Sequence, residues 1–143
     1  ERAPQARPGA PVAEEALVAG LLDAPTRIAA TLERLRPEEF ASAAHLAAIQ
    51  WLSTLQGADP VARLHEAGPA VAEVISRALS GARRKDEDGK VWNDCIKQIH
   101  LSALNRRVDE LNEMLRSSTG EDRADRIKEL TQVLAEMNEF KHN

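Results

Sequence analysis

The chain has 143 residues, of which 43% are hydrophobic and 29% are charged, and its formal net charge at pH 7 is −4. A chain of this size buries about 70% of the surface that its unfolded form exposes, which argues against disorder throughout and allows one domain or two small subdomains. It has neither the ~20 uninterrupted apolar residues of a membrane span nor the apolar segment of a signal peptide, so we expect a soluble cytoplasmic protein. The single cysteine, Cys95, excludes an internal disulfide and a multi-thiolate metal site.

The charge is spread evenly along the chain. Residues 1–90 carry 11 basic and 13 acidic side chains and residues 91–143 carry 8 and 10, so each part has a net charge of −2. The one basic run, residues 83–85, is followed at once by three acidic residues. Nucleic-acid binders present a basic face that neutralises several phosphates, so we expect no direct binding to DNA or RNA.

The composition predicts an all-α fold. The chain contains 24 Ala and 16 Leu but no Tyr, and alanine and leucine favour helices. Residues 1–11 contain three prolines and a glycine, which is typical of a linker, and because the first residue is Glu rather than Met we expect the chain to be a fragment of a longer protein. We predict a compact bundle of five or six helices over residues 12–99 and a helical hairpin over residues 100–143.

Glycine and proline separate the apolar periodic segments of the predicted bundle. Pro25 suits the first turn of a helix, Ser42 is the expected N-cap of another, and Gly57 and Gly81 are expected just after helix ends. The predicted bundle helices span about residues 12–22, 25–35, 43–55, 60–64 and 69–79, with a single turn at residues 37–40.

Residues 90–118 contain neither glycine nor proline and predict one long helix. Beyond residue 100 its apolar residues repeat at steps of three and four, the a/d pattern of a helix that packs lengthwise on a partner. A turn at residues 117–120 and a last helix with the same pattern complete an antiparallel hairpin. The first expected seam comprises Leu101, Leu104, Val108, Leu111 and Leu115, and the second comprises Ile127, Leu130, Leu134 and Met137.

Two helices cannot bury every apolar side chain of such a hairpin, so an uncovered patch is expected. A partner helix would pack on these anchors, and neighbouring charges would set its orientation and association rate. The alternatives are that the same side chains fold back onto the bundle or pair two copies of the chain. The candidate partner-binding residues are Met114, Arg126, Glu129, Val133, Met137, Phe140 and Lys141.

Patterns for catalysis or metal binding are weak. Cys95 and His100 are five residues apart on one predicted helix and do not share a face. The four histidines lie on separate elements without His-x-x-x-His spacing. We therefore expect no catalytic residue, no metal site and no cofactor in this chain.

Carboxylate pairs keep one enzymatic alternative open, an all-helical nucleotide hydrolase. Glu110 with Glu113, and Glu136 with Glu139, have the i, i+3 spacing that such enzymes use. These pairs, like the adjacent residues 14–15, are interpreted as solvated charges because they lie among polar neighbours outside the apolar seam.

Four patterns follow one another in the first half of the chain. They are Glu15-Ala16-Leu17-Val18 with Leu21-Leu22, then Pro25, then Leu35-Arg36-Pro37-Glu38-Glu39-Phe40, and then His45-x-x-x-Ile49. Together they resemble the helical module shared by the C-terminal helicase-binding domain of bacterial DNA primase and the N-terminal domain of the replicative helicase. Val18 stands where the family more often has leucine, which keeps the apolar face.

The segment Asp94-Cys95-Ile96-Lys97-Gln98-Ile99, followed by the long helix and the last helix, is similar to the primase domain rather than the helicase domain. The resemblance spans about residues 13–143. It implies a non-catalytic domain that docks primase onto the helicase and modulates helicase activity. The parent would be a primase, a nucleotidyltransferase with DNA-directed RNA polymerase activity, whose zinc-binding and polymerase domains precede Glu1.

The resemblance also implies partners and a location. The main partner would be the hexameric replicative helicase, with a single-strand DNA-binding protein as a second candidate, and the domain alone would be a monomer in the bacterial cytoplasm. Three alternatives stay open: the N-terminal collar domain of the helicase, which would self-associate, the nucleotide hydrolase, and a generic adaptor bundle.

Overall fold

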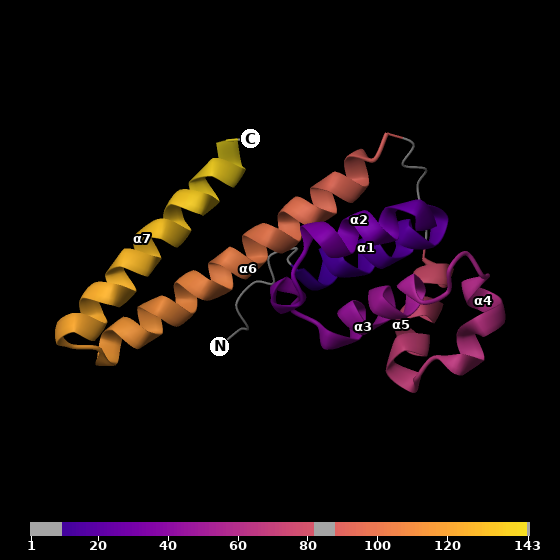
Figure 1. Ribbon diagram of the computed structural model, residues 1–143, viewed down its shortest axis with the longest axis horizontal. Helices are drawn as coiled ribbons and strands as arrows, with labels where there is room; N and C mark the ends of the chain where they lie inside the picture. The colour runs from indigo at the N-terminus through magenta and orange to yellow at the C-terminus, as the bar shows by residue number, and fades with distance from the viewer. Residues whose placement is uncertain (1–9, 82–87, 143) are drawn as a thin grey trace, which may run out of the picture. The chain divides into compact units, whose positions relative to one another are not determined.

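The computed structural model describes the backbone of residues 10–81 and 88–142 and the side chains of residues 12–81 and 88–140. Within these ranges the regular structure is helical throughout (Figure 1), which confirms the predicted all-α class. None of the described helices combines the length and the apolar character needed to cross a lipid bilayer. The chain divides into two compact units, residues 1–99 and 100–143, and each is described by itself.

Unit 1, residues 1–99, is built from short helices separated by glycine and proline. The predicted helix at residues 25–35 is divided in two, because Pro25 starts a 3-10 turn before the α-helix begins. The helix predicted from residue 12 begins at Ala10 instead. The helical elements of unit 1 are α1 (Ala10–Asp23), η1 (Pro25–Arg27), α2 (Ile28–Arg34), η2 (Pro37–Glu39), α3 (Ala43–Ser53), α4 (Pro60–Arg63), η3 (Leu64–Glu66), α5 (Pro69–Ser80) and the first part of α6 (Lys90–Ser117).

Local side-chain contacts set several of these helix ends. The Ser42 hydroxyl accepts a hydrogen bond from the backbone N–H of His45 at 3.3 Å and caps α3, as the sequence predicts. The Asp59 carboxylate accepts from the backbone N–H of Val61 at 3.0 Å and caps α4. α3 ends at Ser53, and Gln56 and Gly57, three and four residues later, have positive φ angles of 49° and 90°, through which no α-helix continues.

The core of unit 1 lies where α1, α3 and α5 pack on one another and on the first part of α6. Thr31 is 0% exposed and makes two hydrogen bonds in this core. Its hydroxyl donates to the Arg27 carbonyl at 2.7 Å and accepts from the Trp92 indole N–H at 2.8 Å. The indole thereby links α2 to α6. The fully buried aliphatic side chains of the core include Leu17, Val18, Leu21, Leu35, Ile49, Ile75, Ile96 and Ile99.

Unit 2, residues 100–143, consists of the rest of α6 and of α7 (Gly120–His142), which we call the α6–α7 pair. The two helices run in opposite directions (Figure 1): the last turn of α6 contacts the first turns of α7, and the middle of α6 contacts the end of α7. Arg123 donates to the Leu115 carbonyl at 2.9 Å, and the rings of His100 and Phe140 lie 5.1 Å apart. The apolar residues between the helices are Leu104, Val108, Leu111, Met114, Leu130, Val133 and Met137.

The seam expected on α7 is wrong at two of its four positions. Ile127 and Leu134 are 45% and 48% exposed, whereas Val133 is buried. Both sets of residues repeat at steps of three and four and share Leu130 and Met137, so spacing alone cannot choose between them. Relative to the expected orientation, α7 is rotated about its own axis so that Val133 faces α6. Polar and aromatic contacts from α6 to residues 129 and 140 accompany this rotation.

This rotation predicts unequal costs for two leucine truncations. Leu111→Ala, at a position with 0% exposure, should destabilise the α6–α7 pair by about 2–5 kcal/mol, because the loss of apolar contact leaves a cavity. Leu134→Ala, at a half-exposed position, should change stability by less than about 1 kcal/mol. Amide hydrogen exchange along α7 measures both effects. Equal loss of protection in the two variants would contradict the rotation.

Candidate functional site

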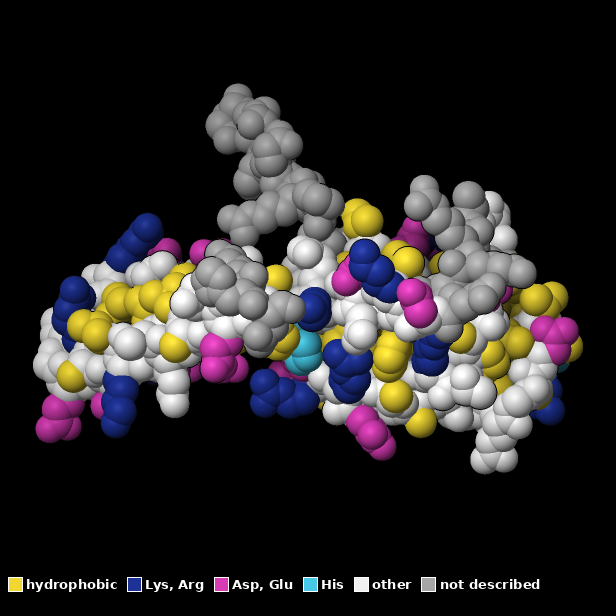
Figure 2. Space-filling view, turned by 90° about the horizontal axis from the view of Figure 1, so that it is seen from above, with side chains coloured by type: hydrophobic (Ala, Val, Ile, Leu, Met, Phe, Trp, Pro, Cys, Tyr) yellow, Lys and Arg dark blue, Asp and Glu magenta, His cyan; other side chains and the backbone are white. Residues whose placement is uncertain are grey.

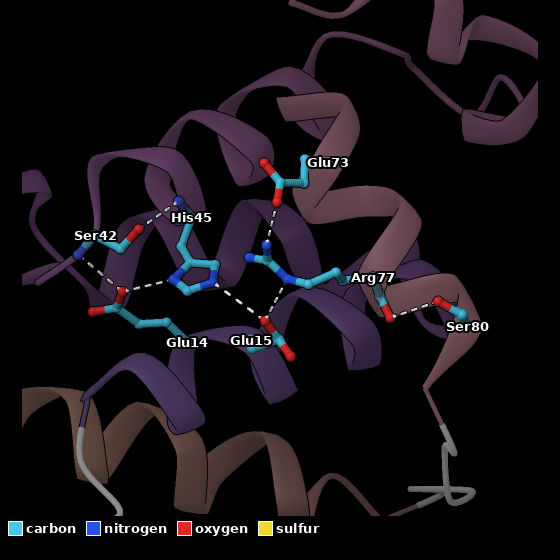
Figure 3. Close-up of polar contacts among 7 residues, drawn as sticks. All are labelled: Glu14, Glu15, Ser42, His45, Glu73, Arg77 and Ser80. Atoms are coloured by element: carbon cyan, nitrogen blue, oxygen red, sulfur yellow. Dashed lines mark hydrogen bonds and ion pairs between the residues drawn. The ribbon is translucent and has the colours of Figure 1, made fainter. Parts of the chain in front are cut away.

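A buried carboxylate lies at the centre of unit 1. Glu14 is 0% exposed, and its two oxygens accept hydrogen bonds from three donors. The backbone N–H groups of Ala41 and Ser42 donate at 2.6 and 3.1 Å, and Nδ1 of His45 lies 3.1 Å from Oε1 (Figure 3). A buried charge requires such donors, because leaving water without them costs several kcal/mol. Glu14 therefore fastens the segment between η2 and α3 to α1.

The contacts continue from His45 toward α5. Because a carboxylate only accepts, the His45–Glu14 contact assigns a proton to Nδ1. Nε2 then faces Glu15, whose Oε1 lies 3.9 Å away, too far for a hydrogen bond (Figure 3). Arg77 donates to the same Oε1 at 3.1 Å and to Glu73 at 3.0 Å. Three helices, α1, α3 and α5, thus contribute to one polar network.

The expectation that residues 14–15 are a solvated pair is wrong for Glu14 and correct for Glu15, whose side chain is 45% exposed. A signal for burial was present in the sequence. Glu14 precedes Leu17 by three residues and Leu21 by seven, so it lies on the apolar face of α1. The sequence could not name its partners, which lie 27 to 31 residues further along the chain.

The residues considered for catalysis or metal binding do not form a site among the described residues. Cys95 is buried in the core of unit 1. Glu110 and Glu113 each accept a hydrogen bond from an arginine of their own helix, at 3.0 and 3.1 Å. Among the described residues, no three His, Cys, Asp or Glu side chains are grouped so that they could hold a metal ion.

The predicted partner-binding residues occupy different environments in the α6–α7 pair. Val133 and Met137 are buried between the helices. Met114 and Phe140 are half-buried, Phe140 against the ring of His100. The side chain of Lys141 lies outside the described residues.

The two remaining candidates, Arg126 and Glu129, are polar residues on α7. The Glu129 carboxylate accepts from Nε of Arg107 at 2.8 Å and also from Nη2. Glu129, and then Glu110, raise the pKa of Arg107 above its ordinary value, so this guanidinium is charged at every physiological pH. Arg126 is half-buried, and its Nε has no hydrogen-bond partner within the described part of the chain.

A second repeat on α7 faces outward, which we call the α7 stripe. Figure 2 shows a row of hydrophobic side chains along one face of the α6–α7 pair. Ile127 and Leu134 are the large apolar members of the stripe, and both are about half exposed. The α7 stripe is uncharged and repeats at steps of three and four, as in a coiled-coil seam. It comprises Ala124, Ile127, Thr131, Leu134 and Asn138, all of them exposed.

The Glu14 network predicts a large cost for a neutral isostere. Glu14→Gln should destabilise unit 1 by about 2–4 kcal/mol. The amide NH₂ would replace an oxygen that accepts hydrogen bonds in the unchanged chain, so a buried donor would lose its acceptor. Glu15→Gln, a matched change at a half-exposed neighbour, should cost less than about 1 kcal/mol. Trp51 and Trp92 both lie in unit 1, so urea unfolding followed by tryptophan fluorescence reports this unit. Equal unfolding midpoints for the two variants would refute the role of Glu14.

Comparison with known protein families, curated proteins and solved structures found no match to this chain. Two features stand out, the polar network around Glu14 and His45 in unit 1 and the α7 stripe in unit 2.

Proposed function

We propose that this chain is a non-catalytic protein-interaction domain of bacterial DNA primase, which docks primase onto the replicative helicase and modulates helicase activity during primer synthesis. The proposed architecture is a compact bundle, unit 1, followed by a helical hairpin, the α6–α7 pair. One observation carries the docking function: the α7 stripe is an exposed, uncharged seam with the spacing of a helix-packing surface.

The stripe suits a partner helix for two reasons. Ile127 and Leu134 are seven residues apart, two helical turns along one face, so they occupy the same heptad position and can anchor a second helix. Asp125 and Lys128, both exposed, flank the stripe with opposite charges that can fix the orientation of the partner. Large side chains that are half exposed at such regular spacing favour a docking face over a solvated surface.

The identity of the partner rests on the resemblance to the primase domain. The motif residues Leu17, Phe40, His45 and Ile49 are buried in unit 1, which agrees with a mainly structural motif. In this proposal the hexameric helicase is the main partner and a single-strand DNA-binding protein is a second candidate. The fragment needs no cofactor, and priming chemistry belongs to other domains of the parent protein.

A second candidate function is the N-terminal collar domain of the replicative helicase. The α7 stripe favours it as well, because an uncharged seam at heptad spacing can pair with the same seam of another copy. The two candidates differ in what the isolated chain does: the primase domain should be a monomer, whereas the collar domain should self-associate.

The docking proposal predicts that a charge in the stripe abolishes binding. Leu134→Asp should weaken binding to the replicative helicase at least ~10-fold, because a carboxylate would be desolvated at the centre of an apolar contact. Val61→Asp, at a 57% exposed position of unit 1, is the matched control and should bind as the unchanged chain does. Titration calorimetry gives the affinities.

Size-exclusion chromatography with light scattering separates the candidates. A monomer that co-elutes with the helicase hexamer supports the primase domain, and loss of co-elution in Leu134→Asp places the interface on the stripe. A dimer that Leu134→Asp converts to a monomer, without helicase binding, supports the collar domain. Unchanged helicase binding by Leu134→Asp would show that the stripe is not the docking face.

A further inference from the structure

A cavity of about 490 Å³ opens between α1, α3 and α5, beside the polar network of Figure 3. Its wall is formed largely by the small side chains of Ala16, Ala19 and Ala78. His45, Glu15 and Arg77 supply its polar part. The cavity therefore combines an apolar wall with one cluster of charged and hydrogen-bonding atoms.

One atom of this cluster lacks a partner. His45 is 5% exposed, and its Nε2 is buried with no hydrogen bond to any described residue. In a neutral imidazole whose proton is on Nδ1 and faces Glu14, Nε2 presents a lone pair. A buried acceptor without a donor is uncommon and costs about 1–3 kcal/mol, and none of the described residues supplies that donor.

The geometry specifies what kind of donor is missing. Nε2 of His45 and Oε1 of Glu15 are two acceptors 3.9 Å apart. A nitrogen atom about 2.8–3.0 Å from both of them must carry at least two hydrogens to serve both. A hydroxyl group carries one hydrogen and satisfies only one of them, whereas a primary ammonium group carries three.

The local charge favours a cation over a neutral amide. Among the described residues, three carboxylates belong to this network, those of Glu14, Glu15 and Glu73, and Arg77 is the one guanidinium bonded within it. These four charged groups sum to −2, and a cation that enters the cavity lowers this repulsion. The alanine side chains of the wall suit methylene groups, not further polar atoms.

We propose that this cavity binds a primary ammonium group on an alkyl stem, with the ammonium between His45 Nε2 and Glu15 Oε1 and the stem against the alanines. This is the chemistry of a lysine side chain and of small aliphatic amines. The site is separate from the α7 stripe, so its existence does not depend on the proposed docking function.

The test uses the whole chain and n-butylammonium, which matches a lysine side chain. Long-range ¹H–¹⁵N NMR spectra report the imidazole nitrogens, and a hydrogen bond to Nε2 moves its ¹⁵N resonance. Saturable movement with n-butylammonium, and little movement with n-butanol at the same concentrations, supports the site. No saturable movement, or an equal response to n-butanol, overturns it and leaves an ordered water as the partner of Nε2.

Two variants make the test specific. Glu15→Gln removes a charge from a half-exposed side chain, and Ala16→Leu fills the cavity from an exposed position, so both should fold. Each should weaken n-butylammonium binding at least ~5-fold, whereas Glu66→Gln, an exposed carboxylate on η3, should leave it unchanged. Equal affinities in all three variants overturn the proposal.

The source of the ammonium group is resolved by a second titration. An acetylated and amidated lysine peptide that binds more tightly than n-butylammonium identifies a protein lysine as the ligand. Tighter binding of the free amine identifies a small aliphatic amine. Failure of both to bind overturns the site, and helicase binding by the same sample shows whether the docking function survives independently.

Discussion

Unit 1 depends on the carboxylate of Glu14, which is completely buried yet fully supplied with donors. A carboxylate in a protein interior is stable only when hydrogen bonds replace its water. Two backbone N–H groups from the segment that leads into α3 and the imidazole of His45, in the first turn of α3, provide them. The position of α3 on α1 is therefore set by polar contacts, and the apolar side chains of Leu17 and Ile49 pack within that arrangement.

This arrangement also explains why His45 is a candidate for binding. The requirement of Glu14 for a donor orients the imidazole and fixes the proton on Nδ1. The ring then presents Nε2 toward Glu15, beside the cavity that His45 helps to line, and no described residue donates to Nε2. A single side chain thus supports the fold with one nitrogen and leaves the other for a ligand.

In unit 2, helix α7 carries two overlapping apolar repeats, of which one packs on α6 and the other is exposed. The apolar residues of α7 are more numerous than one partner helix can cover, so contact with α6 buries Val133 and Met137 and leaves Ile127 and Leu134 exposed. Beside the buried seam, Nε and Nη2 of Arg107 both donate to Oε2 of Glu129. The surplus repeat is the physical basis for a docking function, because exposed apolar side chains at helical spacing gain stability from a further helix.

The sequence by itself determined the all-α class and most helix ends, because these depend on local signals: alanine and leucine content, the caps Ser42 and Asp59, and the prolines and glycines between segments. Only the tertiary structure decided that Glu14 is buried and which face of α7 meets α6. The donors to Glu14 come from residues about 30 positions away, and the two repeats on α7 have the same period. Local pattern cannot resolve either case, since the choice is made by contacts between distant parts of the chain.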